Sequence, residues 1–144
     1  MPDAIDLVIV TPEKQLLREK TVEVQMPGEN GYLGILPGHA PLMTELGIGE
    51  LSYHDTSSKE SAHIAIIRGF AEVLSDRVTI LAETAERAEE IDLQRAKDAL
   101  ARAEKRLAAN DPNIDWDRAN IALQRALIRI QVGAKRRSAL VSGS

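Results

Sequence analysis

Hydrophobic residues in the first part of the chain recur at every second position, which is the period of a half-buried β-strand. Residues 22–26 and 62–66 follow this pattern, and an apolar run at 7–10 ends at a Thr-Pro pair. Turn-forming clusters, such as the one at 27–31, separate the apolar segments. Many short strands with frequent turns predict an N-terminal antiparallel β-sandwich or flattened barrel over residues 1–86.

Glycines predict where these strands are interrupted. The segment 46–53 contains Gly47 and Gly49 and predicts two short strands around a bend. Gly69 predicts a tight reversal of the chain, because glycine tolerates backbone conformations that other residues avoid. Residues 70–82, which follow it, predict a closing hairpin.

From about residue 88 the hydrophobic period changes to that of an α-helix. One helix face carries Ala96, Ala99, Leu100, Ala103 and Leu107, and a second carries Ala119, Ala122, Leu123, Ala126 and Ile130. The segment 110–113 contains a proline and breaks the helical pattern, and Asn113 or Asp115 is expected to cap the second helix. The short break predicts a C-terminal antiparallel two-helix hairpin over residues 87–138, followed by a frayed tail at 139–144.

Alanine dominates the predicted seam between the two helices. An alanine seam buries little apolar area, and at about 25 cal/mol per Å² it is weak beside a leucine seam. Isolated helices of this length are themselves marginal in water. We therefore expect a hairpin that detaches from a neighbour, or opens out, at low cost.

Composition excludes several classes of protein. The chain has no cysteine, which rules out disulfide scaffolds, thiolate catalysis and Cys-based zinc sites. Its three histidines form no ligand pair, and 3 % aromatic residues are too few for a base-stacking platform. No segment approaches the roughly 20 apolar residues of a membrane span, and the acidic start is unlike a targeting segment. We expect any membrane association to come through a partner and not through direct insertion.

Charge is distributed unevenly along the chain. Residues 1–117 contain 12 Lys and Arg against 22 Asp and Glu, a net charge of −10, whereas residues 118–144 contain six basic residues and no acid. This asymmetry suggests an acidic or phosphorylated partner for the C-terminal segment, although a solvated basic helix has the same pattern. A nucleic-acid binder is disfavoured, because the pI of about 5.4 and the acidic body would repel the phosphate backbone.

Arginines on the two helices are spaced so that they converge on one side of the hairpin. Arg95 and Arg102 are seven residues apart on the first helix, and Arg125 and Arg129 are four apart on the second. Neither Arg125 nor Arg129 has an acid three or four residues before it. A phosphate ligand, an acidic protein surface and plain solvation all account for this arrangement.

No catalytic constellation is visible in the sequence. There is no Walker A sequence and no GxGxxG motif opening a helix. His39 has no carboxylate or serine at triad spacing, which favours a packed or interface histidine. We expect a chain that is not an enzyme by itself, requires no cofactor and holds no metal.

Two motifs resemble a known family. The segment GYLGILPGHAPL at 31–42, followed by Leu46 and by GEL at 49–51, resembles the signature loop of the epsilon subunit of bacterial F-type ATP synthase. The segment IDLQRA at 91–96 resembles the I-D-x-x-R-A motif at the start of the helical hairpin in that family. The resemblance covers about residues 4–137 and agrees with the order of a β domain and then an alanine-rich hairpin.

The resemblance implies a non-catalytic subunit of the central stalk. The N-terminal sandwich would bind the gamma subunit and the c-ring, with Gly38, His39 and Pro41 in the partner interface. It would thereby help to couple proton-driven rotation to ATP synthesis. The chain would lie at the cytoplasmic face of the bacterial plasma membrane as a peripheral part of the complex.

For the hairpin, the resemblance implies regulation. When extended into the catalytic head, its basic residues would meet the beta subunit and inhibit ATP hydrolysis; the residues concerned are Arg118, Lys135, Arg136 and Arg137. When folded, it would bind ATP as a regulatory ligand through Glu86, Ile91, Asp92, Arg95, Ala96, Arg102, Arg125 and Arg129. The alternative interpretation is a stand-alone ATP-sensing module, which would have no need of the partner-facing loop at 31–42.

Overall fold

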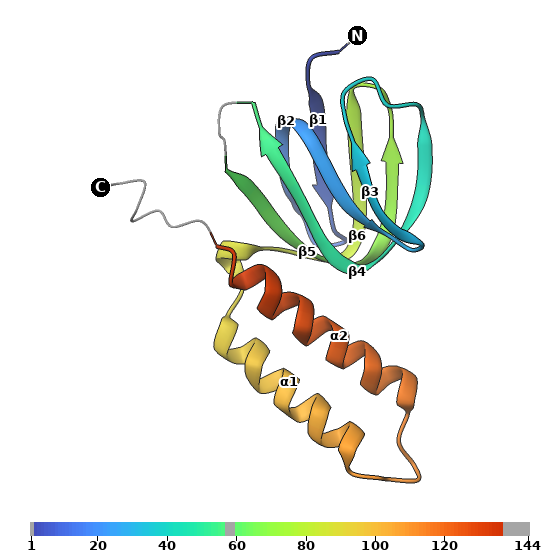
Figure 1. The fold of residues 1–144 in the computed structure, drawn as a ribbon, viewed down its shortest axis with the longest axis vertical. Coiled ribbons are helices and arrows are strands. Elements are labelled where there is room, and N and C mark those ends of the chain that lie inside the picture. Colours follow the sequence, from blue (N-terminus) through green and yellow to red (C-terminus); the bar gives the residue numbers. More distant parts are fainter. Residues whose placement is uncertain (1, 57–59, 137–144) are drawn as a thin grey trace, which may run out of the picture.

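The computed structural model describes residues 2–56 and 60–136 and has a β-sandwich with barrel-like closure followed by two helices (Figure 1). The elements are β1 (Ile5–Val10), β2 (Gln15–Gly28), β3 (Gly31–Ile35), β4 (Leu42–Asp55), β5 (Ser61–Val73), β6 (Arg77–Arg87), η1 (Ala88–Glu90), α1 (Leu93–Ala108) and α2 (Trp116–Gly133). The predicted fold class is therefore confirmed. In the described part of the chain, no helix has the length and apolar character needed to cross a membrane.

The strands are ordered β1-β6-β5-β4-β2-β3, and β1 also pairs with β2. This extra pairing closes five of the strands into a ring and leaves β3 at the margin. Among the strands of the described residues, only β1 and β6 run parallel, with Leu7 opposite Val78. The ring encloses the main core, in which Ile5, Leu7 and Ile9 are fully buried. Closure protects the strand edges that would otherwise pair with other chains.

Two predictions about the strands are wrong. The segment 46–53 does not bend into two strands, and Gly69 does not reverse the chain. The pairs Leu46–Gly69 and Ile48–Ile67 belong to one register between β4 and β5, which stays the same across the unpaired position at Gly47 and Arg68. Glycine is needed at Gly49 and Gly69 because a neighbouring strand lies too close for a side chain. A Cβ at Gly49 would lie 2.5 Å from the Cβ of Pro27, and one at Gly69 would overlap the carbonyl of Leu81.

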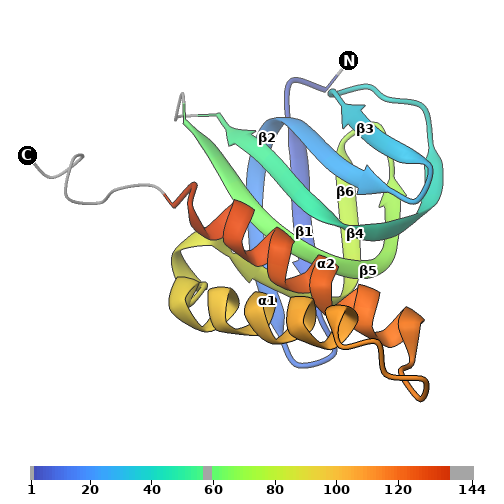
Figure 2. The ribbon, with the colours of Figure 1, turned by 60° about the horizontal axis from the view of Figure 1, so that its bottom comes forward.

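The two helices form the predicted hairpin, and α2 lies nearer to the sandwich than α1 does (Figures 1 and 2). The Asp92 carboxylate caps α1 by accepting a hydrogen bond of 3.1 Å from the backbone N–H of Arg95. Of the two candidates for the second cap, Asp115 fills the role, accepting from the N–H of Arg118 at 3.1 Å. Alanines occupy buried positions along the seam: Ala96, Ala103, Ala119 and Ala126.

A second, smaller apolar cluster attaches the hairpin to the outside of the sandwich. It joins β5 to η1 and α2 through Ala65, Ile67, Ala88, Ile91, Ile128 and Val132, with Ile48 partly buried against it. Gly133 at the end of α2 allows the closest approach, since a Cβ there would lie 2.7 Å from Cδ2 of Leu93 and 3.1 Å from Cγ2 of Ile91. The attachment is therefore much smaller than the core of the sandwich.

Candidate functional site

The junction between the sandwich and the hairpin is centred on an ion pair. Glu86, near the end of β6, accepts a hydrogen bond of 2.6 Å at Oε1 from Nε of Arg129 on α2. Both side chains are about two-thirds buried, with 28 % and 37 % of their surfaces exposed. Arg129 thus finds its acid on another element, 43 residues away in sequence.

A small hollow of about 210 Å³ surrounds this pair. We call it the Asp92 hollow, and it is lined by Glu86, Glu90, Ile91, Asp92, Arg95, Ala96 and Arg129. The end of β6, the first turn of α1 and the second half of α2 meet here. The structure therefore brings together six of the eight residues that the resemblance assigns to ATP.

A larger hollow of about 640 Å³ lies beside it along α2 and shares Arg129 with it. We call it the Arg125 hollow, and it is lined by Arg68, Ala99, Asp115, Asp117, Arg118, Ile121, Ala122, Arg125, Ala126 and Arg129. Arg125 is thus the neighbour of the Asp92 hollow, and a ligand longer than the small hollow would extend toward it. Sequence reasoning did not find Arg68, which comes from the sandwich.

Arg102, which the resemblance assigns to ATP binding, lies away from both hollows. It is exposed on α1 and lines neither hollow. It lies seven residues beyond Arg95, which corresponds to about 10 Å along a helix axis. The predicted convergence therefore applies to Arg95, Arg125 and Arg129 in this structure but does not extend to Arg102.

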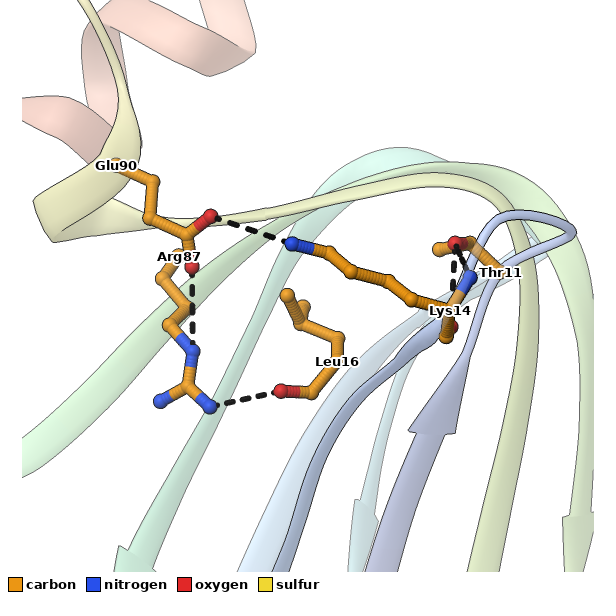
Figure 3. A network of polar contacts seen from close by, with 5 residues as sticks. All are labelled: Thr11, Lys14, Leu16, Arg87 and Glu90. Atoms are coloured by element: carbon orange, nitrogen blue, oxygen red, sulfur yellow. Dashed lines mark hydrogen bonds and ion pairs between the residues drawn. The ribbon is translucent and has the colours of Figure 1, made fainter.

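A network of polar contacts links η1, which adjoins the Asp92 hollow, to the sandwich (Figure 3). Arg87 donates to the carbonyl of Leu16 at 2.8 Å and pairs with Glu90 at 3.2 Å. Lys14 lies 3.9 Å from the other oxygen of Glu90. These contacts hold η1 against the sandwich and so position the adjoining Ile91 and Asp92.

The chemistry of the Asp92 hollow suits a ligand with both polar and anionic groups. The guanidinium groups of Arg95 and Arg129 match phosphate oxygens in charge and geometry. The carboxylates of Glu86 and Asp92 already accept hydrogen bonds, from Arg129 and from the N–H of Arg95. A phosphate at Arg129 would therefore share or replace the contact with Glu86.

The basic residues near the end of α2 are held at the junction. Nζ of Lys135 lies 2.9 Å from Oε2 of Glu50 on β4, whose side chain is only 13 % exposed. Nη2 of Arg136 donates to the carbonyl of Ile91 at 2.9 Å. Arg118 lies at the other end of α2, beside the Arg125 hollow. Arg137 and the predicted tail at 139–144 lie outside the described residues.

Glu50 has a second basic neighbour that sequence spacing did not indicate. Nδ1 of His63 on β5 lies 3.5 Å from Oε1 of Glu50. Glu50 and Lys135 are 85 residues apart in sequence, so no local pattern links them. One carboxylate therefore lies between a histidine of the sandwich and a lysine of the hairpin.

The predicted partner loop connects β3 to β4. Gly38 has a φ of +88°, and its N–H donates to the carbonyl of Ser75 at 2.7 Å. The His39 ring is half-buried, with Nδ1 2.6 Å from the carbonyl oxygen of Ala40, whereas Pro41 is exposed. The loop is thus fixed against the turn between β5 and β6 while part of it faces outward. Among the described residues, no group of three or more His, Cys, Asp or Glu side chains could hold a metal ion.

These features define a class by its fold: a closed β-sandwich with a lightly attached helical hairpin. Comparison with known families then identifies it. Residues 4–88 match the ATP synthase delta/epsilon chain β-sandwich domain, and residues 89–133 match the ATP synthase delta/epsilon chain long α-helix domain. The chain belongs to the family of ATP synthase delta/epsilon chains, which confirms the resemblance found in its motifs.

Curated relatives agree with this family. An ATP synthase epsilon chain of Koribacter versatilis is 56 % identical over 112 residues, which is 78 % of each chain. One of Solibacter usitatus is 48 % identical over 136 residues, covering 94 % of this chain and 100 % of the relative.

Solved structures show the same fold. A chain of the Euglena gracilis mitochondrial ATP synthase (OSCP/F1/c-ring) has a TM-score of 0.80 and 24 % identity, covering 93 % of this chain and 83 % of that one. A chain of the Tetrahymena thermophila central stalk and c-ring has a TM-score of 0.57 and 17 % identity, covering 91 % and 94 %.

Proposed function

We propose that this chain works in the central stalk of a bacterial F-type ATP synthase, where it couples proton-driven rotation to ATP synthesis and regulates ATP hydrolysis. It has no catalytic role of its own and lies at the cytoplasmic face of the plasma membrane. The family and its curated epsilon-chain relatives support this assignment. The observation that carries the regulatory part is the small attachment of α2 to the sandwich, which consists of one apolar cluster and two ion pairs.

The sandwich is the part that binds the gamma subunit and the c-ring. An apolar hollow of about 630 Å³ on its surface supports docking, and it is lined in part by Phe70 and Leu81. Both side chains are more than half exposed, as is Met43 beyond the partner loop. Exposed apolar patches of this kind mark interaction surfaces in soluble proteins.

The hairpin is the regulatory part. When it is folded on the sandwich, Lys135 contacts Glu50 and Arg136 contacts the carbonyl of Ile91. Release of the hairpin would free both side chains to meet an acidic segment of the beta subunit, and this contact inhibits ATP hydrolysis. The same cations would thus hold the hairpin down in one state and act on the catalytic head in the other.

ATP is the regulatory ligand of the folded hairpin and binds at the Asp92 hollow and along Arg125 and Arg129. Because this site combines residues of β6, α1 and α2, ATP would stabilise the arrangement in which they meet. A ligand at 100 times its dissociation constant stabilises the binding state by about 2.7 kcal/mol. That is enough to control a hairpin held by a small apolar cluster and a few ion pairs.

Co-purification with a gamma-type subunit tests this proposal. The tagged full chain should retain gamma from a lysate of its own organism, and the assembled enzyme should hydrolyse ATP faster when the chain lacks residues 88–144. A chain that binds ATP but retains no gamma subunit would instead be a stand-alone ATP-sensing module.

A further inference from the structure

Arg68 has a backbone conformation that arginine rarely adopts. Its φ is +56°, in the left-handed region. Yet it lies in the middle of β5, where the register with β4 continues on both sides of it, from Ile67 to Gly69. Glycine would adopt this φ without strain. An outlier of this kind in regular structure points to a role for the side chain.

Arg68, which also borders the apolar hollow around Phe70 and Leu81, contributes to the Arg125 hollow from the sandwich. There it joins Arg118, Arg125 and Arg129, so that four guanidinium groups border one cavity. Of the two aspartates at the same cavity, Asp115 already accepts the N-cap hydrogen bond. Within residues 2–56 and 60–136, no ion pair is formed by Arg68, Arg118 or Arg125, so their charges repel one another across the hollow.

An extended polyanion is the ligand that fits this arrangement. The Arg125 hollow continues into the Asp92 hollow through Arg129, which lines both. The Asp92 hollow holds three carboxylates beside Arg95 and Arg129 and suits the end of a ligand where a polar group adjoins a phosphate, whereas four arginines border the Arg125 hollow. A nucleoside triphosphate has this polarity, with a base at one end and a chain of phosphates at the other.

We propose that Arg68 is a binding residue for the polyphosphate chain of a nucleoside triphosphate and supplies the contact from the sandwich. The proposal rests on the nucleotide binding in the proposed function and adds a residue that the resemblance did not assign. Its consequence is geometric. A phosphate held between Arg68 on β5 and Arg125 on α2 ties the hairpin directly to the sandwich, so the phosphate chain itself holds the hairpin down.

Substitution of Arg68 by glycine tests this without endangering the fold, because glycine relieves the strained φ. ATP, AMP and inorganic tripolyphosphate are titrated by calorimetry into the full chain and into the Arg68→Gly, Arg68→Lys and Arg77→Ala variants. Arg77 is an exposed arginine of the same sandwich that lines neither hollow, so it controls for net charge. We expect Arg68→Gly to weaken ATP and tripolyphosphate about fivefold, the value of one exposed ion pair.

The three ligands separate the sources of the effect. AMP affinity should change little in Arg68→Gly, Arg68→Lys should keep part of the affinity for ATP, and Arg77→Ala should bind as the parent does. Equal ATP affinity in parent and Arg68→Gly overturns the role of Arg68 and leaves nucleotide binding intact. An equal loss for AMP and ATP means that Arg68 supports the fold and overturns the phosphate contact.

Two further results would reach beyond Arg68. A parent chain that binds none of the three ligands at millimolar concentration overturns the nucleotide part of the proposed function and this inference with it. Binding of tripolyphosphate without binding of ATP overturns the assignment of the ligand as a nucleotide.

Discussion

Glu86 on β6 and Arg129 on α2 form an ion pair of 2.6 Å that joins the sandwich to the hairpin at the edge of the Asp92 hollow. The pair is only partly buried, so its net contribution is modest, about 1 kcal/mol. Because the rest of the attachment is one small apolar cluster, a contribution of this size changes how often the hairpin is released.

Loss of this ion pair should loosen the hairpin without unfolding the sandwich. We expect Glu86→Gln and Arg129→Gln each to speed amide hydrogen exchange in α2 severalfold, while exchange in β1 stays unchanged. In the double variant, the loss of protection free energy in α2 should be smaller than the sum of the two single losses, with a coupling of about 1 kcal/mol. Full additivity would show that the two side chains do not interact in solution.

The contact between Lys135 and Glu50 allows docking and inhibition to be separated. Glu50→Gln and Lys135→Ala both remove the ion pair, so both should favour release of the hairpin. They should have opposite effects on hydrolysis by the assembled enzyme, because only Glu50→Gln keeps the lysine that we propose to meet the beta subunit. Lys105→Ala, at the far end of α1, is the matched control. If both variants relieve inhibition equally, Lys135 makes no inhibitory contact.

Gly133→Ala should shift the hairpin toward release for two reasons. The added methyl group would lie 2.7 Å from Cδ2 of Leu93 when the hairpin is folded, and alanine stabilises a free helix by up to ~1 kcal/mol relative to glycine. Hydrogen exchange of Ile128 and Val132 should speed up. Leu93→Ala, which makes room, should restore much of the protection in the double variant, and failure to do so would remove the steric part of the explanation.

The sandwich should fold and bind gamma on its own. Its core lies within β1 to β6, and the hairpin covers only the outer cluster at Ile48, Ala65 and Ile67. A chain ending at Arg87 should melt in one cooperative transition, since Arg87 keeps its hydrogen bond to the carbonyl of Leu16. We expect this truncated chain still to bind the gamma subunit. A truncated chain that folds but no longer binds gamma would place part of the interface on the helices.

The period of hydrophobic residues was enough to predict the β domain and the hairpin, because these depend on local spacing. The local sequence limited the cap of the second helix to Asn113 or Asp115, and the structure decides for Asp115. The prediction failed at Gly49 and Gly69, where glycine is needed because a neighbouring strand leaves no room for a side chain. The ion pairs of Arg129 and Lys135 could not be predicted, because their acids are 43 and 85 residues away and come close only when the hairpin packs on the sandwich.

The conformation and position of Arg68 also could not be predicted from the local sequence. Nothing in the neighbouring residues indicates a positive φ for an arginine within a strand, and nothing places it opposite α2. Arg68 pairs with neither β4 nor β6, although the register of β5 with both strands is the same on either side of it. The motif at 91–96, by contrast, placed Asp92, Arg95 and Ala96 at one hollow from the sequence alone.

The distance between the sandwich and α2 in the assembled enzyme tests the central claim most directly. The chain has no cysteine, so exposed Glu72 on β5 and Gln124 on α2 can be replaced by cysteine, and the isolated chain can be spin-labelled at these two sites before assembly. At millimolar ATP we predict a single short distance and rapid ATP hydrolysis. After ATP is removed, a longer distance should appear, and ATP hydrolysis should be inhibited when ATP is first added back. A distance distribution that stays the same with and without ATP, while inhibition changes, would contradict the account.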